Sequence, residues 1–119
     1  MTQNHTGYLS LPAAAAIGEG KRVHINASGQ FALSAAADPS VGVATHACAS
    51  GGPLTVKLWT APGTFPVVAN GAIAAGARLF PTANGNVDDA GTTALNLVAF
   101  EAATSANDII EALPCQVGA

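Results

Sequence analysis

The chain has 119 residues, a formal net charge of −3 and charged side chains at only 9% of its positions, where about 25% is usual for a globular domain. Four Lys and Arg residues against seven Asp and Glu residues exclude the clustered basic surface that binding to nucleic acid requires. The longest apolar stretch, residues 13–17, is too short to span a bilayer, and residues 1–6 have neither the basic nor the apolar region of a signal peptide. We therefore expect no nucleic-acid partner and no membrane partner.

A chain of this length forms one domain, or two very small half-domains with a common core. Scaling of surface with mass allows roughly 65% of the unfolded surface to be buried. With so few charges, the folded surface consists mostly of Ala, Ser, Thr, Asn and Gly. Such a surface is either covered by a partner or simply solvated. Cys48 and Cys115 match no zinc pattern, and their redox state is open.

The first half of the chain shows short strand patterns separated by Gly, Pro and Asn. Residues 1–6 are polar and form either a frayed terminus or an arm that orders on a partner. The alternation of Leu54, Val56 and Leu58 with polar or aromatic residues predicts a strand with one face toward the core. Glycine at position 42 within a strand indicates a close backbone approach or a bulge. The strands predicted here are residues 8–11, 21–25, 30–33, 41–44 and 54–59.

The second half repeats this order after the turn at residues 60–63. Its strands are predicted at residues 64–68, 77–80, 86–87, 94–100 and 108–113. Many short strands at roughly 8–12-residue spacing, without an amphipathic helix of three turns, are typical of an all-β barrel or sandwich. The sequence therefore predicts a small all-β domain.

The two halves also match residue by residue when the first is shifted by 56 positions. Gly7 then meets Gly63, Gly20 meets Gly76 and Arg22 meets Arg78. The register slips by one at Val43, which meets Val98, and by one more at Val56, which meets Ile110. We predict an N-terminal arm at residues 1–6 and one β domain at residues 7–119, with pseudo-repeats at about 7–60 and 63–114.

No set of residues matches a catalytic, cofactor-binding or metal-binding pattern. The segment from Gly18 to Lys21 lacks the spacing of a phosphate loop. The histidines have no ligand partner at the spacing of a metal site, and Asp88 and Asp89 do not continue into a calcium loop. No serine lies in a nucleophile elbow. These residues predict a binding or structural protein that needs no cofactor, not an enzyme.

The order of several motifs resembles the small capsid decoration, or capsid cement, proteins of tailed bacteriophages. The resemblance covers nearly the whole chain from about residue 7, and its motifs consist of common residues whose order and spacing carry the likeness. This chain departs from the usual pattern at residues 59–63, where relatives more often have a shorter polar link, which concerns the central turn. The residues that carry the resemblance are Ser40–Ala44, Leu54–Trp59, Gly63–Val67, Ile73–Phe80, Leu97–Ala99 and Ile109–Leu113.

The resemblance implies a small β-barrel or β-sandwich, β-tulip-like, made of two similar halves. It also implies a homotrimer, made in the host cytoplasm, that binds the outer surface of a phage capsid and stabilises the shell by bridging neighbouring major capsid proteins. Additive burial in several contacts would supply the affinity. The arm residues expected to contact the capsid are Thr2, Gln3, Asn4, His5 and Thr6. The alternative function is a carbohydrate- or ligand-binding β-sandwich, such as a receptor-binding or lectin-like module, which would require clustered exposed aromatic residues.

Overall fold

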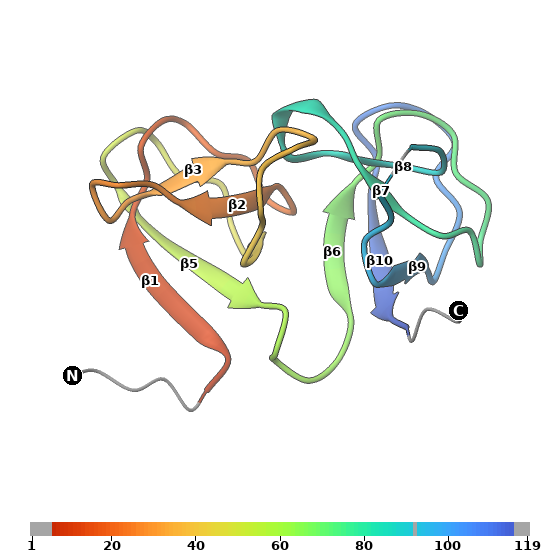
Figure 1. Cartoon of the computed structure of the whole chain (residues 1–119), viewed down its shortest axis with the longest axis horizontal. Coiled ribbons are helices and arrows are strands. Elements are labelled where there is room, and N and C mark those ends of the chain that lie inside the picture. Colours follow the sequence, from red (N-terminus) through yellow and green to blue (C-terminus); the bar gives the residue numbers. More distant parts are fainter. Residues whose placement is uncertain (1–5, 92, 116–119) are drawn as a thin grey trace.

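A computed structural model describes residues 6–91 and 93–115 of the chain. Within these ranges the chain forms antiparallel strands and no α-helix, so the all-β prediction is confirmed. The strands form two groups that lie beside each other along the long axis of the molecule, one from each half of the sequence (Figure 1). No helix long and apolar enough to cross a membrane occurs in the described part of the chain.

The first half forms a five-stranded sheet in the order β1-β5-β4-β2-β3. The pairing of β1 with β5 places Leu9 opposite Val56 and Leu11 opposite Leu54. Because side chains alternate along a strand, these four residues face the same side and pack into the first core. The strands are β1 (Tyr8–Pro12), β2 (Arg22–Ile25), β3 (Phe31–Leu33), β4 (Gly42–Ala44) and β5 (Pro53–Leu58).

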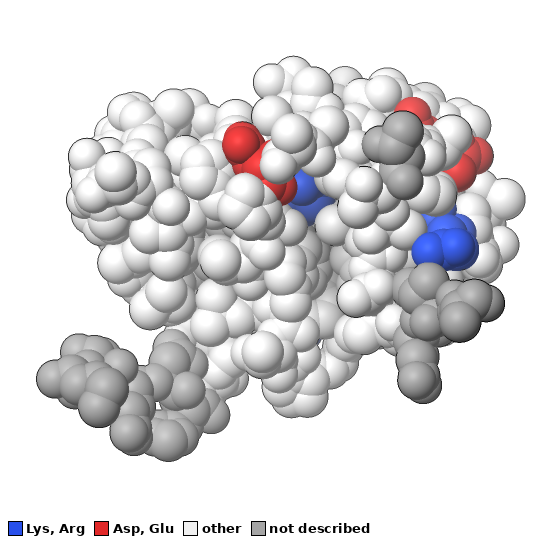
Figure 2. Space-filling view, viewed as in Figure 1, with Lys and Arg blue, Asp and Glu red and all other residues white. Residues whose placement is uncertain are grey.

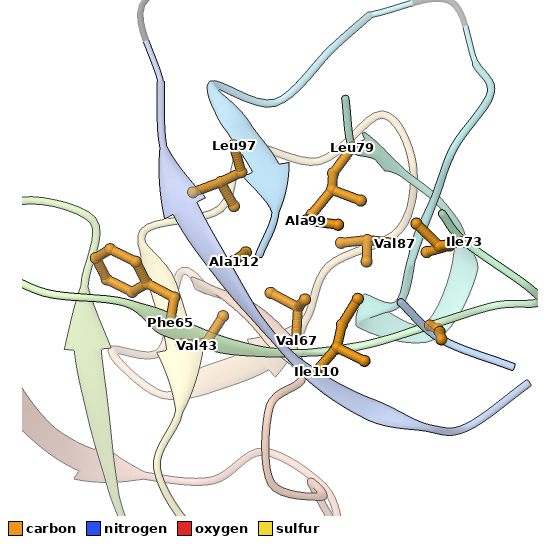
Figure 3. Packing of buried hydrophobic residues seen from close by; sticks show 12 residues of the cluster. Val43, Phe65, Val67, Ile73, Leu79, Val87, Leu97, Ala99, Ile110 and Ala112 are labelled. Atoms are coloured by element: carbon orange, nitrogen blue, oxygen red, sulfur yellow. The ribbon is translucent and has the colours of Figure 1, made fainter. Parts of the chain in front are cut away.

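The second half forms a three-stranded sheet, β6-β10-β9, and a small two-stranded sheet, β7-β8. Its core contains Phe65, Val67 and Ile110, together with Val43 from the first half. Figure 3 shows Val43 and Phe65 side by side at the border of this core. The elements are β6 (Phe65–Val68), β7 (Phe80–Pro81), a 3₁₀ turn (Ala83–Gly85), β8 (Val87–Asp88), β9 (Leu97–Ala99) and β10 (Ile109–Pro114).

The described sheets remain open, because none of the strand orders closes on itself. The barrel form of the predicted fold is therefore not seen. The predicted strand at residues 94–100 is also shorter than expected. Only Leu97–Ala99 pair with β10, whereas Leu95 donates its N–H to the carbonyl of Leu79.

The backbone of the second half repeats that of the first at a spacing close to 56 residues. Leu9 pairs with Val56, and Phe65 pairs with Ala112, each 56 positions later. The bridge between Ile17 and Cys48 has its counterpart between Ile73 and Ala103. These matches support the two-copy organisation, which stays a prediction about domains.

Left-handed residues occur at the same places in both halves. Gly20 and Gly76 have φ of 80° and 83°, and Gly29 and Gly85 have φ of 75° and 74°. A positive φ of this kind favours glycine because it has no Cβ. The two halves therefore share these glycine positions, whereas Asn84, with a φ of 60°, has no left-handed counterpart at Ser28.

One part of the sequence register is wrong. The sequence comparison matched Val56 with Ile110. In the structure Leu11 pairs with Leu54 and Val67 pairs with Ile110, so Ile110 is the counterpart of Leu54. The two registers differ by two residues and put the same side chains on the core face, so only the pairing with β1 and β6 distinguishes them.

Candidate functional site

The predicted arm lies almost entirely outside the described residues. Thr2, Gln3, Asn4 and His5 belong to that part of the chain, and nothing is described for them. Thr6 is described and exposed, and its Oγ1 accepts the backbone N–H of Tyr8 at 3.2 Å. The chain thus enters the fold at β1, an outer strand that pairs with β5.

A buried arginine joins the two halves. The Nε–H of Arg22 donates to the carbonyl of Asn86 at 3.1 Å, and its Nη2 donates to the carbonyl of Thr82 at 2.8 Å. The second half approaches so closely here that a Cβ on Gly85 would lie 2.8 Å from the carbonyl oxygen of Arg22. The arginine therefore holds the loop of residues 82–86 against β2.

The guanidinium of Arg22 is removed from solvent, with a relative exposure of 0%. Burial lowers its pKa to about 10, and the nearby charge of Asp38 acts in the opposite direction. Its Nη1 is buried and has no hydrogen-bond partner. A buried donor without a partner costs free energy, which offsets part of what the hydrogen bonds of Nε and Nη2 contribute.

A groove of about 850 Å³ runs along the contact between the halves. Figure 2 shows basic and acidic atoms side by side in the hollow between the two halves and a second group of charged atoms at the right, while the rest of this face is without charge. The groove has mostly apolar walls, and Arg22, which is among its lining residues, is itself 0% exposed. Residues that line it include Arg22, Asp38, Ser40, Trp59, Leu97 and Cys115.

The end of β5 packs against the second half. The ring centroids of Trp59 and Phe65 are 5.1 Å apart in an edge-to-face arrangement, and Nζ of Lys57 lies 4.7 Å from the centre of the Phe65 ring. Trp59 also donates its Nε1–H to the carbonyl of Ser40 at 3.0 Å. These contacts fix Trp59 in the protein, so its ring is used in packing.

Serine, histidine and aspartate side chains meet at the edge of the groove. Nδ1 of His24 lies 3.4 Å from Oγ of Ser34 and 4.0 Å from Oδ2 of Asp38. A catalytic triad needs the serine and the aspartate on opposite nitrogens of the imidazole, whereas here both face the same nitrogen. Oγ of Ser34 also points to the carbonyl of Pro39. The three residues therefore do not have the geometry of a nucleophilic site.

Two glutamate side chains of the second half accept hydrogen bonds from neighbouring groups. Glu101 accepts the backbone N–H of Glu111 at 2.9 Å, and Glu111 accepts the hydroxyl of Thr64 at 2.6 Å. Among residues 6–91 and 93–115, no three of His, Cys, Asp and Glu come together as metal ligands would. The predicted absence of a catalytic or cofactor site stays a prediction.

Both cysteines are free thiols. Cys48 packs against the first core and lies 3.3 Å from the carbonyl of Pro53. Cys115 lines the groove in the other half. Neither therefore acts as a covalent link between the halves.

The sequence placed Arg22 in the strand predicted at residues 21–25 and did not reveal the contact between Arg22 and the second half. One signal was available, because Arg22 and Arg78 occupy equivalent positions in a chain with only four Lys and Arg residues. The two differ in the structure, since Arg22 is buried and Arg78 is exposed. Only the packing of the halves distinguishes them.

No protein-family model and no curated protein sequence matches this chain. Among solved structures, the fold is similar to that of the N base of the head fiber protein gp8.5 in bacteriophage phi29. The match has a TM-score of 0.73 and 14% sequence identity, and it covers 90% of this chain and 92% of the other. At this identity the comparison establishes a common fold over nearly the full length of both chains.

Proposed function

We propose that this chain is a structural protein of a bacteriophage virion and binds the outer surface of the head. The observation that carries the proposal is the common fold, over 90% of the chain, with the base of a phage head fiber protein. The motif order between residues 40 and 113 points independently to capsid decoration proteins. The β-tulip-like description of the fold belongs to this proposal.

The partner in this proposal is the major capsid protein, and the chain acts as a homotrimer that bridges neighbouring capsid subunits and stabilises the shell. The scarcity of charge supports this role, because a surface with 9% charged residues can be covered without leaving charges unpaired. Contact with several capsid subunits at once raises the effective concentration of each further contact. Moderate individual interfaces are therefore sufficient.

The arm residues Thr2, Gln3, Asn4, His5 and Thr6 are proposed to lie on the shell. They precede β1, which is an outer strand of its sheet, so the chain leaves the fold at an edge. An extended arm can add to a neighbouring sheet through its backbone alone. This mode needs no particular side chains.

The alternative, a carbohydrate-binding module, is not favoured by the aromatic residues that the structure describes. Sugar recognition by stacking needs an exposed ring platform, whereas Trp59 is packed against Phe65. Tyr8 and Phe100 are exposed by 44% and 62%. Tyr8 belongs to the first half and Phe100 to the second, so the two rings do not form one platform. The capsid role is therefore the better supported proposal.

The test is the ratio of this chain to the major capsid protein in density-purified particles from its source. We expect many copies at a fixed ratio to the capsid protein. A few copies per particle would instead indicate a fibre or receptor-binding module, and complete absence from particles would overturn the virion proposal.

The role of the arm is tested by adding the purified chain to phage heads that lack this protein. Deletion of residues 2–6 is expected to lower the number of bound copies. The control replaces these residues by the same five in scrambled order, which retains the backbone groups and is expected to bind nearly as well as the natural arm. Full binding by the deleted variant would contradict the arm assignment and leave the virion proposal standing.

A further inference from the structure

The two halves of one chain meet through two unlike faces. Face A belongs to the first half, where Gly20 packs against Val68, Arg22 donates to the loop at residues 82–86, and Val43 enters the second core. Face B belongs to the second half and receives these groups. Face A consists of Gly20, Arg22 and Val43, and face B consists of Val68, Gly85 and Asn86, all of them buried.

The second half carries its own version of face A, which we name face A′. Its residues are Gly76, Arg78 and Val98, the counterparts of Gly20, Arg22 and Val43. Gly76 and Arg78 are exposed, and Val98 is half-buried. The hydrogen bond from Gly20 to Ala44 recurs from Gly76 to Ala99 at the same 2.8 Å, so face A′ has the backbone geometry of face A without its cover.

The first half carries a version of face B, which we name face B′. Its residues are Pro12, Gly29 and Gln30, the counterparts of Val68, Gly85 and Asn86. Pro12 and Gly29 are exposed and Gln30 is half-buried. A Cβ on Gly29 would meet nothing within 4 Å, whereas a Cβ on Gly85 would collide with Arg22.

The loop of face B′ is closed at its ends by the same backbone hydrogen bond as the loop of face B, although the turns between these ends differ. In the bound loop, Thr82 donates its N–H to the carbonyl of Asn86 at 3.1 Å, and Asn26 donates to the carbonyl of Gln30 at 2.9 Å in the free loop. The carbonyls of Thr82 and Asn86 accept the guanidinium of Arg22. Their counterparts are the carbonyls of Asn26 and Gln30. The carbonyl of Asn26 accepts the N–H of Gly29 at 3.0 Å and that of Gln30 accepts the N–H of Asn26, which leaves each oxygen one lone pair for a second guanidinium.

The outer strands β6 and β1 also differ in how deeply their equivalent residues are buried. In β6, Phe65 and Val67 are fully buried, with relative exposures of 0%. In β1, their counterparts Leu9 and Leu11 are only half-buried. Strand β6 is covered by the first half, and β1 lacks the equivalent cover within the chain.

From these faces we propose that copies of this chain dock head to tail, with face A′ of one copy on face B′ of the next. Figure 1 shows β1 on the left of the molecule and β9 and β10 on the right of β6, with β5 and β6 between them, so the two faces lie apart within one copy. The guanidinium of Arg78 takes the place of Arg22 and donates to the carbonyls of Asn26 and Gln30 on the neighbouring copy. Each new contact then repeats the contact already present inside the chain.

Contacts between unlike faces form a ring if the rotation closes and a filament if it does not. Three copies would place six half-domains around such a ring, in agreement with the homotrimer of the proposed function. The inference deepens that part of the proposed function. It concerns only copies of this chain, so it can be tested in solution without a capsid.

The experiment measures the mass of the purified chain in solution over a range of concentrations, by sedimentation velocity and native mass spectrometry. Arg78→Glu disrupts face A′ and Pro12→Glu disrupts face B′, and both positions are exposed in the single chain. Ala106→Glu, at an exposed position on neither face, is the control. Circular dichroism establishes that each variant remains folded.

The natural chain and the Ala106→Glu control are expected to form a discrete oligomer. Each face variant alone is expected to raise the concentration of half-assembly by more than about tenfold. An equimolar mixture of the two variants is expected to form dimers and nothing larger, because each pair retains one intact face A′ and one intact face B′. A contact between identical faces would not be restored by mixing.

A natural chain that stays monomeric at about 1 mM, where even weak specific contacts are populated, overturns the inference. Variants that assemble like the natural chain overturn it as well, and so does a mixture that stays monomeric. A chain that assembles in solution but is absent from virus particles would leave this inference standing and overturn only the proposed function.

Discussion

Gly42 lies where two strands approach so closely that no side chain fits, and we predict that Gly42→Ala is severely destabilising. A Cβ at this position would lie 2.1 Å from the carbonyl oxygen of Lys57 and 2.9 Å from Cα of Leu58. Both atoms belong to the backbone of β5, which pairs with β1 on its other side. The strand therefore cannot move aside without disturbing the centre of the sheet.

The expected loss of stability follows from the contacts that must break to make room for the added Cβ. The 2.1 Å contact is about 1.3 Å shorter than the 3.4 Å at which ordinary contact begins. The overlap is relieved only if β4 and β5 separate, which weakens the hydrogen bonds of the ladder at Gly42, Val43 and Ala44. Each lost hydrogen bond costs about 1 kcal/mol. With about 1–3 kcal/mol for overpacking, we expect a loss of about 4 kcal/mol from a total stability on the order of 10 kcal/mol.

The control is Gly29→Ala, which separates steric overlap from backbone strain. Gly29 has a φ of 75° and open space where a Cβ would lie, so alanine there costs only about 1 kcal/mol of left-handed strain. Gly42 is not among the residues with positive φ, so its substitution reports overlap alone.

The assay is urea denaturation followed by circular dichroism at low protein concentration. With a slope of about 1.5 kcal/mol per molar urea, Gly42→Ala is expected to lower the midpoint by roughly 2–3 M and Gly29→Ala by less than about 1 M. A midpoint for Gly42→Ala within about 0.5 M of the natural chain, or above that of Gly29→Ala, would refute the reasoning.

Three further predictions use the same assay or a thermal melt. Arg22→Ala is expected to lower the stability by about 2–4 kcal/mol, because it leaves buried carbonyls without a donor. Arg78→Ala is expected to change the stability of the dilute chain by less than about 0.5 kcal/mol. Equal losses for the two variants would contradict the assignment of faces. Val43→Ala is expected to lower the stability by about 2 kcal/mol through a cavity in the second core, and Val98→Ala by clearly less. A larger loss for Val98→Ala than for Val43→Ala would contradict the packing. Hydrogen bonds from the preceding loop lower the pKa of Asp108 below its usual 3.8, so its ionised form stabilises the fold above about pH 4 and this contribution is lost as the pH falls through the lowered pKa. The difference in melting temperature between the natural chain and Asp108→Asn should therefore shrink from about pH 6 to about pH 3, and a constant difference would count against this account.

Local sequence patterns predicted much of the fold. The alternation of Leu54, Val56 and Leu58 predicted a strand, and β5 covers these residues. Glycine at position 42 indicated a close backbone approach, and the structure places the backbone of Lys57 there. These features depend on neighbours in the chain or on the lack of a side chain, and both are readable in a sequence.

The register between the halves was only partly predictable. The spacing of 56 residues is visible in Gly20 and Gly76, which share a left-handed φ. The position of Ile110 relative to the first half was wrong, because Val, Ile, Leu and Ala satisfy either register in an alternating strand. Only the pairing of β10 with β6 distinguishes the two.

The all-β class, the scarcity of charge and the match between residues 56 positions apart are readable in the sequence, because composition, period-two alternation and turn residues act locally. The different surroundings of equivalent residues arise from the packing of the two halves against each other. Arg22 is buried against the second half and Arg78 is exposed, although their sequence contexts correspond. Two similar halves in one chain make a single contact, which covers face A of the first half and face B of the second. The equivalent faces, B′ on the first half and A′ on the second, are therefore left without a cover.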